Sequence, residues 1–223
     1  MSENKQLSNP YRKMGTIHNA GLDFLIGNLK PKEVTIEKII DNIGLFMEKV
    51  NETESKIDLA TYCGTVASAI NRNNQVPFDE ILRELKVTKE GRCFINDILN
   101  VSEDYDYPTA LKVVENIELN ILTSEMTQEE RQYPLIMVAI AKSSIEYWIK
   151  QINDKKSSWI PFVEGGDLAR RKWPWKSDAR GGTALGISGL VTGGWLGGLL
   201  GGLLGGIGGA IGFSVSDFFF PKE

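Results

Sequence analysis

The chain contains a single histidine, His18, and it lies in a stretch of small and polar residues near the N-terminus, NPYRKMGTIHNAGLDFL. On a helix, this stretch places an aromatic, a glycine and the histidine on one face, with an amide and a carboxylate four residues apart at its edge. An imidazole with such neighbours is a candidate general base or metal ligand. The alternative, which we favour, is a buried histidine that hydrogen-bonds another helix. The residues of this N-terminal motif are Tyr11, Gly15, His18, Asn19 and Asp23.

Other reactive side chains lack the spacing that catalysis requires. Two cysteines outside any CxxC pattern, together with one histidine, do not make a zinc ligand set, and we expect both cysteines to be reduced core residues. Two adjacent serines lack the GxSxG context, no phosphate-binding loop is present, and an acidic loop lacks EF-hand spacing. We therefore expect a protein that is not an enzyme and that uses no metal or cofactor. These residues are Cys63, Cys93, Ser143, Ser144, Glu103, Asp104 and Asp106.

Apolar periodicity predicts helices through most of residues 10–153. Pro77 and Pro108 suit the first turn of a helix, and Thr127 with Glu130 forms a capping-box pattern. Residues 135–141 are apolar all round and predict the buried centre of a bundle. The fold class is therefore all-α, a soluble bundle of six or seven helices. Besides the N-terminal motif, the expected helices are 35–50, 55–71, 77–86, 88–99, 108–123 and 127–152.

The helical pattern stops near residue 153, and the composition then changes twice. Proline and glycine interrupt residues 154–180, which we interpret as a linker. Residues 181–216 contain no charged side chain, and residues 217–223 form a short end. The predicted organisation is an N-terminal helical domain (1–153), a basic linker rich in Trp, Pro and Gly (154–180), a glycine segment (181–216) and a short tail (217–223).

Within the glycine segment, pairs of glycines alternate with pairs of large apolar residues, so that glycines recur every four residues in two columns. On a helix, this spacing makes one flat stripe and one apolar stripe opposite. Interior glycine destabilises a helix in water, whereas hydrocarbon favours helix because unpaired amides are costly there. The flat stripe suits close helix–helix packing. We expect a hydrophobic membrane helix or helical hairpin, with helix-packing residues Gly189, Gly193, Gly194, Gly197, Gly198, Gly201, Gly202, Gly205, Gly206 and Gly209.

Ten strongly apolar residues between Leu190 and Ile211 predict only marginal insertion, about −3 to −6 kcal/mol before any glycine penalty. Tryptophans interleaved with cations precede the glycine segment, which is typical of a lipid headgroup boundary. Phe218 to Phe220 would anchor the far interface. The expected membrane-interface residues are Arg170, Arg171, Lys172, Trp173, Trp175 and Lys176.

Three stretches carry a resemblance: the pattern NPYxxxGxxHNxGLD, the helix AKSSIEYW, and SDARGGTALG leading into the glycine repeats. Together they resemble a family of uncharacterised bacterial proteins with a helical N-terminal domain and a glycine-rich tail. The tail itself is similar to the glycine-zipper core of two-peptide bacteriocins. The resemblance implies a membrane-active tail and no assigned activity for the helical domain.

These patterns favour a membrane-associated protein whose glycine zipper inserts and self-associates, bacteriocin-like or pore-forming. One alternative is a tail-anchored adaptor, not an enzyme, that uses the zipper to dimerise; another is a soluble protein whose tail packs on its own domain. The expected partners are a lipid bilayer and further copies of the chain. The net charge of −4 is unevenly placed: a basic patch lies at residues 170–180 and the remainder is acidic, which argues against a nucleic-acid-binding body. No secretory signal is evident, so we expect synthesis in the cytoplasm and membrane association through the C-terminal segment.

Overall fold

The computed structural model describes residues 8–54, 87–102 and 105–163, and six separate positions after residue 178. The described part of the chain is all-α: it contains five α-helices and no strand. The six separate positions are Ala179, Ala210, Ile211, Val215, Phe218 and Phe219.

The α-helices are α1 (Arg12–Asn28), α2 (Ile36–Glu54), α5 (Lys89–Leu99), α6 (Tyr107–Thr123) and α7 (Gln128–Asn153), with 3₁₀ turns η1 (Pro31–Glu33) and η2 (Ile160–Phe162). They confirm the helices predicted from residues 35–50, 88–99, 108–123 and 127–152, to within a few residues at each end. The predicted helices 55–71 and 77–86 lie outside the described residues.

Side chains at the N-termini set where three of these helices begin. Thr127 caps α7: its Oγ1 accepts a hydrogen bond from Glu130 N at 3.3 Å, and Glu130 Oε2 accepts one from Thr127 N at 2.8 Å. This is the capping box predicted from the sequence. Asp106 caps α6 and Thr88 caps α5 in the same way, each accepting a backbone N–H three residues on. Each cap satisfies a backbone donor that the first turn leaves without a helical partner.

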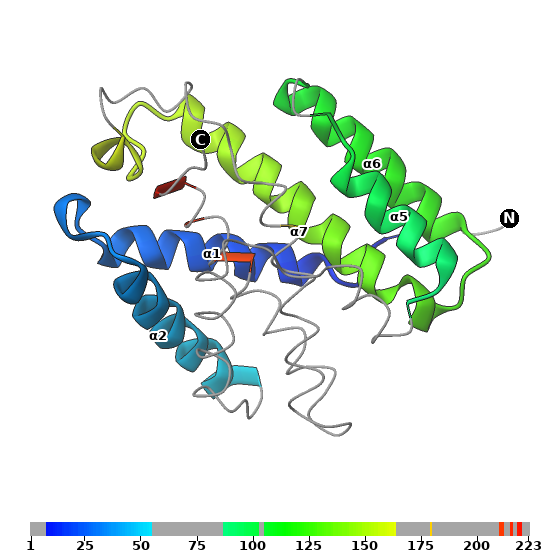
Figure 1. Cartoon of the computed structure of the whole chain (residues 1–223), viewed down its shortest axis with the longest axis horizontal. Coiled ribbons are helices and arrows are strands. Elements are labelled where there is room, and N and C mark those ends of the chain that lie inside the picture. The colour runs from blue at the N-terminus through cyan, green and yellow to red at the C-terminus, as the bar shows by residue number, and fades with distance from the viewer. Residues whose placement is uncertain are drawn as a thin grey trace, which may run out of the picture.

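Helix α7 is the central element and divides the described structure into two layers, with α1 and α2 on one side and α5 and α6 on the other (Figure 1). Its residues 135–141 are all buried, as their apolar composition predicted. Ile136, Ile140 and Trp148 pack into the α1–α2 cluster, whereas Met137, Val138 and Ile145 pack into the α5–α6 cluster. A helix with neighbours on both sides must be apolar around its whole circumference, which explains this run.

Packing continues beyond the last residue of α7. Trp159 and Val163, from the segment predicted to be a linker, are buried in the α1–α2 cluster. Ala210, Ile211, Val215 and Phe218 lie in the same cluster, and Ala179 lies in the α5–α6 cluster. Among the described helices, none combines the length and apolarity needed to cross a membrane.

Of the two cysteines, only Cys93 lies among the described residues. Cys93, on α5, is a free thiol and is exposed, so the expectation that it lies in the core is wrong. It occupies the outer face of its helix, while Ile95 and Ile98 carry the buried face. Cys63 lies outside the described residues.

Candidate functional site

Helices α1 and α7 run parallel along a close seam. Asn9, Asn19 and Asp23 contact Leu135, Ser143 and Tyr147 in that order, so the contacts advance in the same direction on both helices. Gly15 makes the close approach possible: a Cβ at this position would lie 2.5 Å from the carbonyl oxygen of Ala139 and would also collide with the Ser143 side chain. The N-terminal motif therefore supplies the surface that docks α1 on α7.

His18 is fully buried in this seam. Asn19 donates from Nδ2 to the Ser143 carbonyl at 2.9 Å, which leaves its Oδ1 3.0 Å from His18 Nδ1. With the amide held in this orientation, Oδ1 is the acceptor and the ring carries its proton on Nδ1. Burial lowers the pKa of His18 from 6.5 to about 4, against a smaller opposing effect of the Asn19 hydrogen bond. At neutral pH the ring is an uncharged packing element, inaccessible to solvent.

Asp23 takes part in a polar chain that crosses from α1 to the residues after α7. Trp159 Nε1 donates to the Tyr147 hydroxyl at 2.7 Å, and that hydroxyl donates to Asp23 Oδ1 at 2.9 Å. The residue that assists His18 is therefore Asn19 rather than Asp23. Asp23 instead fixes Tyr147, and through it the orientation of the buried Trp159 ring.

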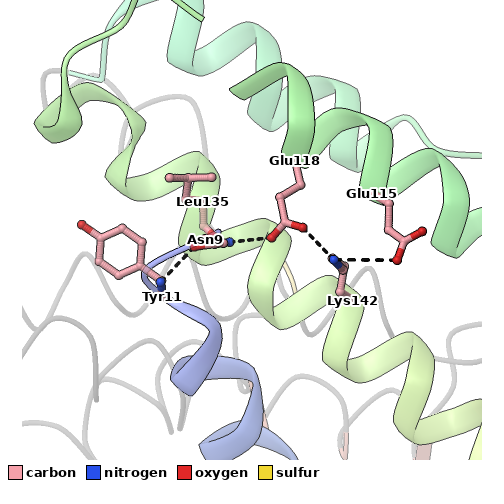
Figure 2. Close-up of polar contacts among 6 residues, drawn as sticks. All are labelled: Asn9, Tyr11, Glu115, Glu118, Leu135 and Lys142. Atoms are coloured by element: carbon pink, nitrogen blue, oxygen red, sulfur yellow. Dashed lines mark hydrogen bonds and ion pairs between the residues drawn. The ribbon is translucent and has the colours of Figure 1, made fainter. Parts of the chain in front are cut away.

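A second polar cluster joins α1, α6 and α7 (Figure 2). Glu118 is almost fully buried; its Oε1 accepts a hydrogen bond from Asn9 Nδ2 at 2.9 Å, and its Oε2 lies 2.6 Å from Lys142 Nζ. Asn9 also donates to the Leu135 carbonyl at 2.8 Å, and Lys142 lies 3.8 Å from Glu115. Both carboxylate oxygens of Glu118 thus have a donor, as a buried charge requires.

A polar pocket of about 370 Å³ opens beside this cluster, between α1, α6 and α7. Its charges are mixed, with Arg12 and Lys142 opposed by Glu118 and Glu146. Because Lys142 is held in an ion pair with Glu118, it is a poor candidate for a general base, and the buried His18 does not line the pocket. Nor do the described residues include a cluster of metal-ligating side chains. The pocket has the polarity of a solvated groove rather than the apolar walls of a typical ligand site.

Phe218 and Phe219 occupy an aromatic site near the end of α7. Phe218 is 1% exposed and stacks on Trp148, with the ring centroids 5.9 Å apart and an angle of 8° between the planes. Its edge meets Trp159 at 4.8 Å and 67°, and Phe219 packs edge-on against both Phe218 and Phe162. Stacked and edge-to-face pairs at these separations are favourable beyond the area they bury.

Ile211 fits over α1 at Gly21. Gly21 has Ile211 directly above it, in the place that a Cβ would occupy, and such a Cβ would also lie 2.9 Å from Phe46 Cε1. Ile211 and Val215 are completely buried. We call Ile211, Val215 and Phe218 the C-terminal anchors, and the surface of α1, α2, α7 and Trp159 that holds them the anchor groove.

The structure brings together the whole N-terminal motif but leaves most of the expected membrane site outside the described residues. Tyr11 N donates to Asn9 Oδ1 at 2.9 Å, and this bond orients the Asn9 amide that contacts α7 at the Leu135 carbonyl. The zipper glycines Gly189–Gly209 and the basic tryptophan boundary 170–176 are not among the described residues. Phe218, expected at a far lipid interface, is instead buried in the helical domain.

Sequence reasoning missed the anchor groove, although a signal for it is present. Ile211, Val215 and Phe218 follow the i, i+4, i+7 spacing of a helical face, but the surrounding low-complexity composition favours a lipid-facing interpretation. Trp159 falls in the predicted linker because a proline follows two residues later. The partly buried Lys142 is detectable as the one charge within a long apolar stretch.

Comparison with protein-family models, with curated proteins and with solved structures finds no match to the chain.

Proposed function

We propose that this is a membrane-associated protein whose glycine segment is stored on a helical platform and later inserts into a bilayer and self-associates. In this proposal the platform is a bundle of six or seven helices, and the glycine segment is helical in the bilayer. The observation that carries the stored state is the burial of residues on both sides of the zipper: Ala179 in one cluster, and Ile211 with Phe218 in the other. The insertion step is supported by the uncharged composition of residues 181–216.

The two ends of the glycine segment are both held on the helical platform, and this constrains how the segment can enter a membrane. A single crossing puts its two ends on opposite sides of the bilayer, which is impossible while both ends are held on one domain. A hairpin made from residues 181–209 would have arms of about 14 residues, or about 21 Å, against a hydrocarbon core of about 30 Å. A full crossing therefore requires the C-terminal anchors to leave their groove.

The free energies of docking in the anchor groove and of insertion into the bilayer are similar in size. Burying three side chains of this size stabilises the docked state by about 5 to 9 kcal/mol, before the entropy of ordering the segment is subtracted. Insertion of the apolar residues offers about 3 to 6 kcal/mol. Because the two terms are similar, a modest change in conditions would move the segment from the groove to the bilayer.

The remaining chemistry supports a role that is not enzymatic. His18 is fully buried, and the residues around it are engaged in joining α1 to α7. The polar pocket offers a paired lysine and no imidazole. We take the N-terminal motif as the device that builds the anchor groove, since Gly21 and Asp23 shape and orient its walls.

A reversible covalent lock tests the proposal. The ideal Cβ position at Gly21 lies 3.0 Å from Cγ1 of Ile211, close to the distance of about 3 Å between a cysteine Cβ and its partner's sulfur in a disulfide. Gly21→Cys with Ile211→Cys, in a chain with Cys63→Ser and Cys93→Ser, should therefore close a disulfide that holds the anchors. Its matched control is Gly27→Cys with Ile211→Cys, since Gly27 faces open space.

The measurement is resistance of the protein to carbonate extraction from anionic vesicles. We expect the oxidised lock to be extracted, the reduced lock to resist extraction, and the Gly27 control to resist it in both states. Extraction of every form, reduced ones included, would contradict membrane insertion. Resistance of the oxidised lock would mean that a hairpin, rather than a single crossing, enters the bilayer.

A second candidate is a soluble protein whose C-terminal segment stays packed on its own domain. It is favoured by the near-complete burial of the three anchors. It predicts that every form in the lock experiment remains with the supernatant, with or without reductant.

A further inference from the structure

The anchor groove has the form of a helix-recognition site. Its occupant presents Ile211, Val215 and Phe218, and the backbone at each of these positions is helical. The spacing i, i+4, i+7 is the set of anchors by which an amphipathic helix binds an apolar groove. Two of the anchors have subsites of their own: Ile211 fits over Gly21, and Phe218 fits between Trp148 and Trp159.

The walls of the groove remain organised by contacts that do not involve the anchors. The hydrogen bonds from Trp159 to Tyr147 and from Tyr147 to Asp23 hold the aromatic wall, and Asn19 ties α1 to the Ser143 carbonyl. Removal of the anchors would therefore leave these wall contacts in place, with the apolar surface that the anchors now cover. A site whose walls are held in this way favours rebinding of a helix with the same pattern.

We propose that the C-terminal anchors of a second copy of this chain occupy the groove, so that two copies exchange anchors reciprocally. This rests on the proposed function in one respect, that the membrane frees the anchors and concentrates the chains. A second copy is the occupant because its anchors are the same residues that fill these subsites within one chain. The exchanged dimer repeats every contact seen within one chain, which makes exchange a low-cost route to association.

The length of chain before the anchors permits this exchange. Thirty residues separate Ala179 from Ala210, so the anchors can reach a neighbouring groove. In dilute solution, the high effective concentration of a chain's own anchors favours the closed form. Crowding at a membrane surface shifts the balance toward exchange by mass action. Groove exchange and zipper packing are then two separate contacts between copies.

Intermolecular disulfide trapping tests this inference with full-length chains that carry Cys63→Ser and Cys93→Ser. One chain, the groove chain, also carries Gly21→Cys together with Ile211→Ala, which removes the side chain that a Cβ at position 21 would meet and is kept in the control below. The other, the anchor chain, carries Ile211→Cys, and the two are mixed and oxidised. The mixture is examined at high protein concentration in water and, separately, with anionic vesicles. The readout is a band at twice the mass of one chain on a gel without reductant.

The matched control replaces Gly21→Cys by Gly27→Cys, because position 27 lies on the same helix but contacts nothing within 4 Å. We expect the dimer band from the groove chain with the anchor chain, and only background from the control pair. Equal bands from both pairs, or none from either, would overturn the inference. The single chain with both Gly21→Cys and Ile211→Cys shows that the two positions can join, which separates absence of exchange from a poorly placed cysteine.

A directional variant distinguishes exchange from zipper contact. Phe218→Ala in the groove chain weakens that chain's own anchors and opens its groove, so the yield should rise. The same substitution in the anchor chain removes one of the exchanged anchors, so the yield should fall; equal effects in both chains would overturn the inference. A positive result in water with no vesicle binding would support exchange while contradicting the proposed membrane function.

Discussion

At the scale of single residues, glycines in α1 illustrate how one residue type serves opposite purposes. Gly15 allows the backbone of α7 to approach, whereas Gly27 faces open space near the end of the same helix. The colliding atoms at Gly15 include a backbone carbonyl oxygen, which cannot move without disturbing α7. The sequence pattern marks both as helical glycines, and only the neighbouring helix distinguishes them.

We therefore predict opposite effects of alanine at these two positions. Gly15→Ala should lower the free energy of unfolding by about 1 to 3 kcal/mol, because it overpacks the seam. Gly27→Ala should raise it by about 0.5 to 1 kcal/mol, because alanine favours helix and meets no neighbour. Urea unfolding followed by circular dichroism measures both. Equal destabilisation by the two substitutions would contradict the seam.

His18 predicts a dependence of stability on pH. Its pKa is lowered from 6.5 to about 4 in the folded state, so the unfolded chain binds the proton first as the pH falls. The contribution of His18 to stability is complete above pH 6.5 and decreases down to pH 4, with a total loss of about 3 kcal/mol. His18 is the only histidine in the chain, so unfolding measured at steps from pH 7 to pH 5 isolates it from the carboxylates.

The control is His18→Gln, which keeps an amide in the seam and does not titrate. Its free energy of unfolding should be nearly flat between pH 7 and pH 5. A variant with the same slope as the native chain would show that the dependence arises elsewhere.

At the scale of elements, two ion pairs have nearly equal lengths and different environments. Lys142 Nζ lies 2.6 Å from Glu118, with side-chain exposures of 19% and 9%; Lys38 Nζ lies 2.7 Å from Glu33, with exposures of 47% and 49%. Water screens the second pair, whereas the first must keep a buried carboxylate in contact with a cation.

We expect Lys142→Met to lower the free energy of unfolding by about 3 kcal/mol, because the buried Glu118 side chain loses the cation that it contacts. Lys38→Met, which breaks a pair of nearly the same length, should have no measurable effect. Thermal unfolding of both variants at pH 7 makes the comparison. A small effect of Lys142→Met would mean that Asn9 alone is enough to hold the Glu118 carboxylate.

At the scale of the whole molecule, the anchor groove couples the helical domain to the location of the glycine segment. Phe218→Ala removes an aromatic ring that is buried between two tryptophans. Because this loss weakens the free energy of docking by about 3 kcal/mol, the fraction of chains with released anchors should rise by roughly a factor of 100.

Two measurements check this prediction. Acrylamide should quench tryptophan fluorescence more strongly, because Trp148 and Trp159 lose the ring that covers them. Binding of the protein to anionic vesicles should also increase. The control is Leu119→Ala, which truncates an apolar side chain that is already 52% exposed. Increased quenching without increased vesicle binding would support docking and contradict the membrane step.

Much of the architecture follows from local patterns. The apolar period predicted four of the described helices, the Thr127–Glu130 pair predicted where α7 begins, and the apolar run 135–141 predicted the centre of the bundle. These features depend on contacts within about one turn of helix, so neighbouring residues specify them. A packing role for His18 is the interpretation that the sequence favours, because the chain holds one histidine and no matching set of ligands or catalytic partners.

Local patterns are thus sufficient for the helical class, the central place of α7, and the uncharged glycine segment with its period-four spacing. Long-range packing, in contrast, makes Gly15 and Gly21 contact points, pairs Glu118 with Lys142, and places Phe218 between Trp148 and Trp159. Each of these contacts joins residues far apart in the chain. An apolar face alone does not specify whether protein or lipid will cover it, because both remove it from water with similar free energies.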